Sequence, residues 1–172
     1  MHKIVSVLAV LLAMLVVAPD VARSSDSNNY WGTNGGACVP VDDAIQNNRY
    51  DVTSGSIVHQ STNIDLIKLS CPIERNNSGS NPTKVWLSWS SPDVADASNF
   101  VSADFYRKAR STGTLTLIVT QDSSTYATNI SEGSAAFTHT LDFNTYYYFM
   151  YVDVDRSSTS NTESFRGVGL GQ

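Results

Sequence analysis

Apolar and polar residues alternate along several short stretches of this chain, and that alternation predicts β-strands. Residues 84–90 place Val85, Leu87 and Trp89 on one face and Trp86 with two serines on the other. A period of two residues is typical of a strand, whereas an amphipathic helix repeats every three to four. The predicted strands are residues 56–60, 65–71, 84–90, 100–108, 114–120, 135–141, 145–155 and 164–170.

Residues 145–155 form the longest predicted strand. Its even-numbered positions from 146 to 154 are apolar or tyrosine and share one face, while Tyr147, Phe149 and Tyr151 share the other with Asp153 and Asp155. Because both faces are apolar until the acidic end, we expect a central strand that is covered on both sides for most of its length.

Clusters of Ser, Asn, Gly and Pro separate the predicted strands, and no stretch has the period of a helix of three or more turns. Many short strands with such turns indicate an all-β fold. We therefore predict a single antiparallel β-sandwich or jelly-roll-like domain over residues 37–172, held by one disulfide.

The first residues have the pattern of a secretory signal peptide. Lys3 precedes an apolar, uncharged run over residues 4–17, and small residues follow near Ser24. The run is too short for a comfortable transmembrane helix, so we predict a signal peptide over residues 1–24. A flexible polar arm is expected over residues 25–36. The mature protein should be secreted or periplasmic, with no membrane insertion after signal removal.

Cys38 and Cys71 are the two cysteines of the chain, and each lies close to a proline. In an oxidising compartment an even pair predicts a disulfide. Closing this loop would stabilise the fold by about 3–4 kcal/mol in the chain-entropy model. A redox or metal-binding pair is the alternative, but neither a CxxC spacing nor a nearby histidine supports it.

The chain carries a net charge of −5. Nucleic acids and anionic membranes need clustered Lys and Arg, so we expect neither as a partner. The chain also lacks the GxSxG, HExxH, Walker and EF-hand motifs, and no catalytic residue is predicted.

Aromatic and acidic residues supply the remaining candidate sites. Trp86, Trp89 and Tyr106, together with the tyrosine run over residues 146–148, could form a platform on which sugar rings stack, although such rings also fill the core between two sheets. Asp153 and Asp155 share a strand face and could hold Ca²⁺, or they could be solvated charges or ion-pair partners. No other cofactor and no His/Cys metal site is predicted.

Several short motifs follow one another in a fixed order along the mature chain. They are Cys38-Val39-Pro40, Tyr50, Gly55-Ser56-Ile57, Cys71-Pro72-Ile73, Val101-Ser102-Ala103, Gly113, Phe137-Thr138-His139, Asp155-Arg156 and Phe165-Arg166-Gly167-Val168. This order resembles a family of small uncharacterised secreted bacterial β-sandwich proteins. The resemblance implies a single β-sandwich with a disulfide, and it assigns no activity.

Three functions remain open from the sequence. The first is a secreted, non-enzymatic β-sandwich with a structural or binding role at or outside the cell surface, whose partner is a glycan or another surface protein. The second is a carbohydrate-binding module that uses exposed aromatic residues. The third is an extracellular hydrolase with carboxylates distant in the chain.

Overall fold

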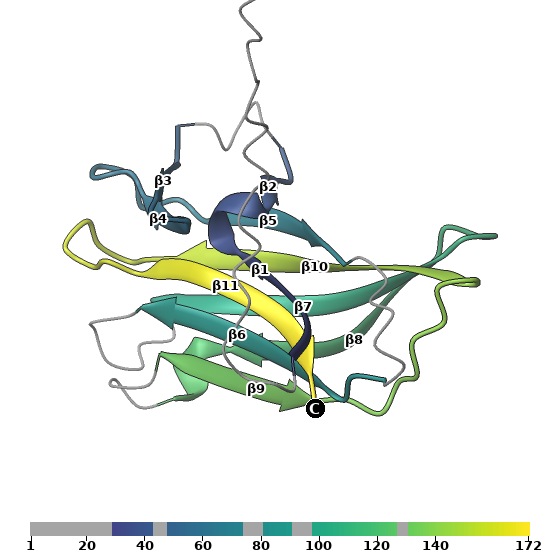
Figure 1. Cartoon of the computed structure of the whole chain (residues 1–172). Coiled ribbons are helices and arrows are strands. Elements are labelled where there is room, and N and C mark those ends of the chain that lie inside the picture. Colours follow the sequence, from purple (N-terminus) through teal and green to yellow (C-terminus); the bar gives the residue numbers. More distant parts are fainter. Residues whose placement is uncertain (1–28, 43–47, 74–80, 91–97, 127–130) are drawn as a thin grey trace, which may run out of the picture.

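The computed structural model describes residues 29–42, 48–73, 81–90, 98–126 and 131–172, and these form two antiparallel sheets that pack as a sandwich (Figure 1). Two single-turn 3-10 helices accompany them, η1 (Gly35–Ala37) and η2 (Ser123–Thr125). The strands are β1 (Asn29–Asn34), β2 (Val39–Pro40), β3 (Tyr50–Thr53), β4 (Ser56–His59), β5 (Ile67–Pro72), β6 (Lys84–Ser90), β7 (Phe100–Ala109), β8 (Leu115–Asp122), β9 (Glu132–Ala136), β10 (Tyr146–Asp155) and β11 (Ser164–Gly171).

The strand order confirms the predicted fold class. One sheet has the order β3-β4-β11-β6-β9, with β1 also paired to β11, and the other has the order β2-β5-β10-β7-β8. Between β4 and β11 the chain changes sheet at every connection except the β7–β8 hairpin. Within the two sheets, strands β4 to β11 therefore form the four-stranded sets β4-β11-β6-β9 and β5-β10-β7-β8, which is the arrangement of a jelly roll.

The core lies between the two sheets and is filled by the inward-facing residues of each strand. Buried and partly exposed positions alternate along β6, so that Val85, Leu87 and Trp89 point inward, as their spacing predicts. From the opposite sheet, β7 contributes Phe105 and β10 contributes Met150, both fully buried. Fully burying an apolar side chain of this size contributes about 1.5–3 kcal/mol, so this layer supplies most of the driving force for folding.

The disulfide prediction is confirmed. Cys38 and Cys71 are bonded, and their Cα atoms lie 4.5 Å apart. The bond fastens β2 to β5, next to the backbone pairing of Val39 with Ser70 and of Pro40 with Leu69. Because β2 has only two residues, few backbone hydrogen bonds join it to β5, and the disulfide adds a covalent link between them.

The predicted flexible arm is wrong in its described part. Residues 29–34 form strand β1, which pairs antiparallel with β11. Gly167 and Gly169 of β11 permit this contact, because a Cβ atom there would lie 2.8 Å from the Thr33 carbonyl oxygen and 2.5 Å from the Trp31 carbonyl oxygen. The polar segment is therefore an additional strand of the six-stranded sheet.

The predicted signal peptide, residues 1–24, and the start of the predicted arm lie outside the described residues. Within the described ranges, no helix has the length and apolarity needed to cross a membrane.

The observed strands follow the predicted ones closely over the domain, with β9 as the main exception. Alternation around Phe137, His139 and Leu141 predicted a strand at 135–141, whereas β9 ends at Ala136. Phe137 is nevertheless buried and lies 5.3 Å from the Phe105 ring, between ring centroids. The alternation therefore identified Phe137 correctly as an inward-facing residue, although it does not belong to a β-strand. The short strands β2 and β3 were not predicted.

Candidate ligand-binding face

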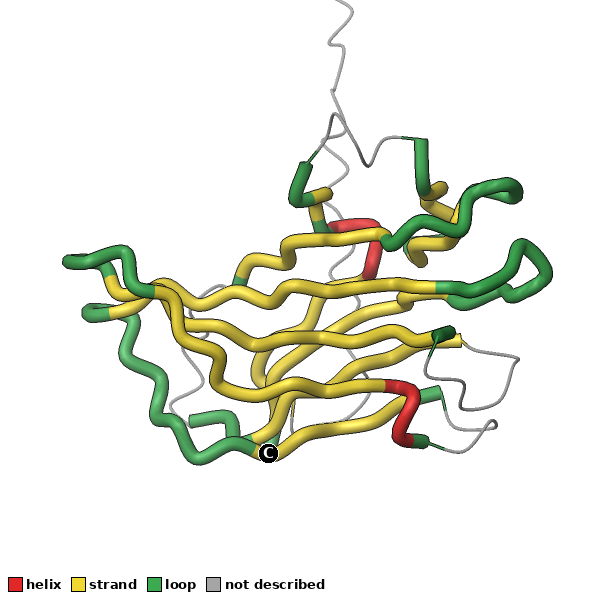
Figure 2. The backbone as a smooth tube through the Cα atoms, turned by 180° about the vertical axis from the view of Figure 1, so that it is seen from behind, coloured by secondary structure: helices red, strands yellow, loops and turns green. Residues whose placement is uncertain are grey.

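The five-stranded sheet has an outer face on which aromatic side chains gather. Figure 2 shows the backbone from the side opposite to Figure 1. Met150 of β10 and Phe105 of β7 are fully buried in the core. Because side chains alternate along a strand, Phe149 and Tyr151 of β10 and Tyr106 of β7 point to the outer face, where all three are half-buried.

These three residues form one cluster, which we call the aromatic trio. Tyr106 lies directly opposite Phe149 across the β7–β10 ladder, and their rings are nearly parallel with centroids 5.9 Å apart. Tyr151 meets both rings edge-on, at 5.5 Å from Tyr106 and 5.0 Å from Phe149. Such contacts hold each ring in place, so the trio is a pre-ordered apolar surface on the sheet.

Apolar residues extend from the trio in a row across four strands. Pro72 of β5 lies opposite Phe149, and Leu117 of β8 lies opposite Tyr106. Leu117 is 48% exposed, which is high for a leucine. With neighbouring strands about 4.8 Å apart, this row crosses roughly 14 Å of the sheet.

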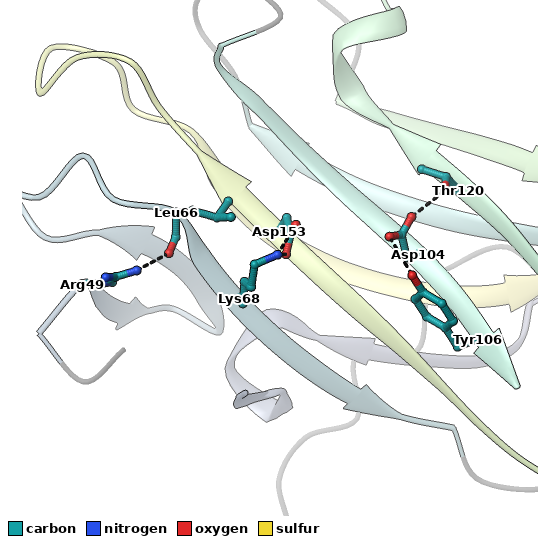
Figure 3. Close-up of polar contacts among 7 residues, drawn as sticks. All are labelled: Arg49, Leu66, Lys68, Asp104, Tyr106, Thr120 and Asp153. Carbon is teal, nitrogen blue, oxygen red and sulfur yellow. Dashed lines mark hydrogen bonds and ion pairs between the residues drawn. The ribbon is translucent and has the colours of Figure 1, made fainter. Parts of the chain in front are cut away.

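Polar groups lie immediately beside the trio. Asp104, two residues before Tyr106 on β7, accepts hydrogen bonds from the Thr120 hydroxyl and, at 3.5 Å, from the Tyr106 hydroxyl (Figure 3). Burial and the neighbouring Asp104 carboxylate raise the pKa of Tyr106 above its ordinary value, so the phenol stays a neutral donor. The trio therefore has hydrogen-bonding groups at its edge.

Further along the same face, charged residues of β5 and β10 form an ion pair. The Lys68 ammonium donates to both carboxylate oxygens of Asp153, at 2.9 and 3.2 Å (Figure 3). Asp155 accepts from its neighbour's backbone N–H, and burial raises its pKa. Calcium requires six to eight oxygen ligands, and among the described residues no group of three or more His, Cys, Asp or Glu is arranged to hold a metal ion. Calcium binding at Asp153 and Asp155 gains no support from this arrangement.

The aromatic residues predicted as a stacking platform do not all lie together. Within the tyrosine run 146–148, Tyr147 is exposed, whereas Tyr146 packs against the core and Tyr148 is buried in it. Trp89 is 2% exposed and packs against Tyr126 in the core, with ring centroids 5.4 Å apart, so its inclusion was wrong. Trp86 points outward from β6, which belongs to the six-stranded sheet. Of the two tryptophans and Tyr106, Tyr106 alone lies on the outer face of the five-stranded sheet. The structure therefore joins Tyr106 to Phe149 and Tyr151 in place of the two tryptophans.

The sequence pattern contained the signal for Phe149 and Tyr151, but its interpretation was wrong. Both residues share a face with Tyr147 on the longest predicted strand, and that face was expected to be covered. In the structure Tyr147 is 54% exposed. An apolar strand face that lies open rather than buried is typical of a binding surface.

Comparisons with known proteins give no family. No protein-family model and no curated protein matches the chain. Among solved structures, the chain is similar to the low-affinity xylan-binding module CBM86 from the gut symbiont Roseburia intestinalis. The two share 11% identity with a TM-score of 0.44, over 81% of this chain and 92% of the other. A likeness of this size supports no inference about a ligand.

Proposed function

We propose that this chain is a secreted or periplasmic glycan-binding domain that holds its ligand on the outer face of the five-stranded sheet. The observation that carries the proposal is the aromatic trio of Tyr106, Phe149 and Tyr151, which is partly exposed on the outer face of the sheet and bordered by hydrogen-bonding groups.

The chemistry of sugars fits such a surface. A pyranose ring presents C–H groups on its faces and hydroxyls around its rim, so its faces stack on aromatic rings while its rim forms hydrogen bonds. Binding sites in general combine an apolar lining with a few placed polar groups. Here the trio supplies the lining, while Asp104, Thr120 and the Tyr106 hydroxyl supply the polar groups. An open strand face also suits a polymer, because a chain can enter and leave it at both ends.

Affinity electrophoresis through gels that contain soluble polysaccharides tests this proposal. Phe149→Ala and Tyr151→Ala should each weaken binding about tenfold, since a central aromatic residue typically contributes more than 1 kcal/mol. Tyr106→Phe keeps the ring and removes the hydroxyl, so it should have a smaller effect than Tyr106→Ala.

Trp86→Ala is the matched control, because it removes a large half-buried ring from the other sheet. It should leave the retardation unchanged, and all variants should keep the circular dichroism of the wild type. Retardation that depends on Trp86 and not on the trio would move the site to the six-stranded sheet. Absence of binding across neutral and acidic polysaccharides would refute the proposal and favour a protein partner for this face.

A further inference from the structure

A cavity lies at one end of the five-stranded sheet, where β7 ends and β10 begins. It has a volume of about 520 Å³ and is lined by Ile73, Arg110, Phe143, Asn144, Tyr147 and Tyr148. Ligand pockets usually have about 300–1,000 Å³ and combine apolar walls with a few polar groups. This cavity has that composition, with three aromatic rings, an amide and a guanidinium.

The cavity adjoins the aromatic trio. Tyr147 lines it and also shares the outer face of β10 with Phe149, two residues further on. Two residues of a strand span about 6.7 Å, which is comparable with the length of one sugar unit. A glycan seated on the trio and directed along β10 therefore places its next unit at Tyr147 and the cavity.

Positive charge is concentrated at this end of the face. The Arg110 guanidinium lies over the Tyr147 ring, 4.2 Å from the ring centroid. Lys108 is exposed and pairs with Tyr147 across the ladder, so it lies on the same outer face. Asp142 is the nearby anion, and its pKa is lowered first by hydrogen bonds from Thr145 and Asn144 and further by Arg110. Among the described residues at this end, two cations against one carboxylate leave a local positive charge on a chain whose net charge is −5.

The other end of the same face is acidic, although Lys68 pairs with Asp153 there and offsets one of its carboxylates. Asp153 lies opposite Ser102, which in turn lies opposite Asp122, so these carboxylates lie on the same face as Asp104. An anionic substituent is repelled from that end and attracted to Arg110 and Lys108. The charge distribution therefore gives a bound chain one preferred direction.

We infer that the Arg110 cavity is a subsite for a carboxylate-bearing sugar, so that the ligand is a glycan with uronic acid units. The inference rests on the proposed glycan binding and adds the class of ligand. Arg110 is suited to the task because a planar guanidinium matches a carboxylate with two parallel hydrogen bonds, and because the Tyr147 ring already orients it. The net negative charge disfavours a densely charged polyanion, so the carboxylates are isolated units on a largely neutral chain.

The test compares one uronic-acid-containing polysaccharide with its carboxyl-reduced form, which differs only in the charged group. At low salt the wild-type protein should bind the acidic form about tenfold more tightly, since hydrogen bonds between charged partners are stronger than those between neutral ones. Arg110→Gln should remove this preference and leave affinity for the reduced form within about twofold. Arg110→Lys should keep only part of the preference for the acidic form, and added salt should weaken the preference of the wild-type protein.

Arg166→Gln is the matched control, because it removes the same charge from an exposed position on β11 of the other sheet. An equal loss in Arg166→Gln and Arg110→Gln would show a net-charge effect and overturn the subsite. Equal wild-type affinity for the two forms would overturn the subsite and leave the proposed function intact. Tighter binding of a sulfated polysaccharide than of the uronic acid polymer would overturn the carboxylate assignment. Failure to bind any of these polysaccharides would refute the proposed function and this inference together.

Discussion

At the scale of single residues, His59 links the fold to pH. Its side chain is 7% exposed, and Nε2 lies 3.1 Å from the Asp65 carbonyl oxygen. The pKa of His59 is lowered to about 4, chiefly by burial and also by the Arg156 charge. The hydrogen bond to the Asp65 backbone and the Asp65 carboxylate raise this pKa and offset part of the lowering. In the unfolded chain the same imidazole takes up a proton near pH 6.5. Acid therefore favours the unfolded chain over the window between these two values.

We expect the free energy of unfolding to fall by about 1–2 kcal/mol between about pH 7 and pH 5, because only the unfolded state gains the His59 proton there. Denaturant titration at both pH values measures this. His59→Gln keeps a donor for the Asp65 carbonyl and should flatten the dependence. His139→Gln is the comparison variant. Burial and Arg107 also lower the pKa of His139, so this variant should remove a part of the pH dependence of stability. An unchanged slope in His59→Gln would contradict the assignment.

At the scale of strands, the sequence predicted those elements in which buried positions are apolar and exposed positions are polar. Alternation placed β6, β7 and β10 correctly because their inward-facing positions are apolar. β1 has a polar sequence, and the information that makes it a strand lies in Gly167 and Gly169 of its partner β11. The polar and apolar pattern of residues 29–34 alone therefore cannot predict that this segment pairs with β11.

The candidate site shows the same limit. Alternation separates the two faces of a strand, and it grouped Trp89 correctly with Val85 and Leu87. It does not say which face is covered by another sheet. Tyr106 and the two tryptophans were chosen from residue type alone, and of these three only Tyr106 lies on this face. Phe149 and Tyr151 were assigned to a covered face, which is partly exposed in the structure.

The short strand β2 provides a test of the disulfide. Val39 is 58% exposed, so burial contributes little to holding β2 against β5. The change Cys38→Ala with Cys71→Ala avoids burying new hydroxyls, and we expect it to lower the free energy of unfolding by about 3 kcal/mol. Denaturant titration measures the loss. Because Cys71 points into the core, on the opposite face of β5 from the aromatic trio, glycan affinity per folded molecule should not change. An unchanged midpoint would mean that the pairing with β5 holds β2 without the bond.

At the scale of the whole molecule, the sandwich presents two outer faces of different character. The six-stranded sheet exposes Trp86 beside Gly169 and Ser134, its cross-strand neighbours. The five-stranded sheet presents the aromatic trio, with cations at one end and carboxylates at the other. The jelly-roll connections bring β5, β7, β8 and β10 together from distant parts of the chain, and this assembly makes one continuous surface from residues as far apart as Pro72 and Tyr151.

The disulfide also bears on where the whole protein works. A disulfide persists in oxidising compartments, which agrees with the proposed secretion signal over residues 1–24. Strand β1 begins at Asn29, so cleavage close to Ser24 leaves its pairing with β11 intact. We expect protein recovered from outside the cytoplasm of its host to start within a few residues of Ser25. N-terminal sequencing of that fraction, with non-reducing peptide mapping of Cys38 and Cys71, measures both features. If the recovered protein retains Met1 and carries free thiols, it resides in a reducing compartment. Such a location would contradict a role in binding glycans outside the cytoplasm.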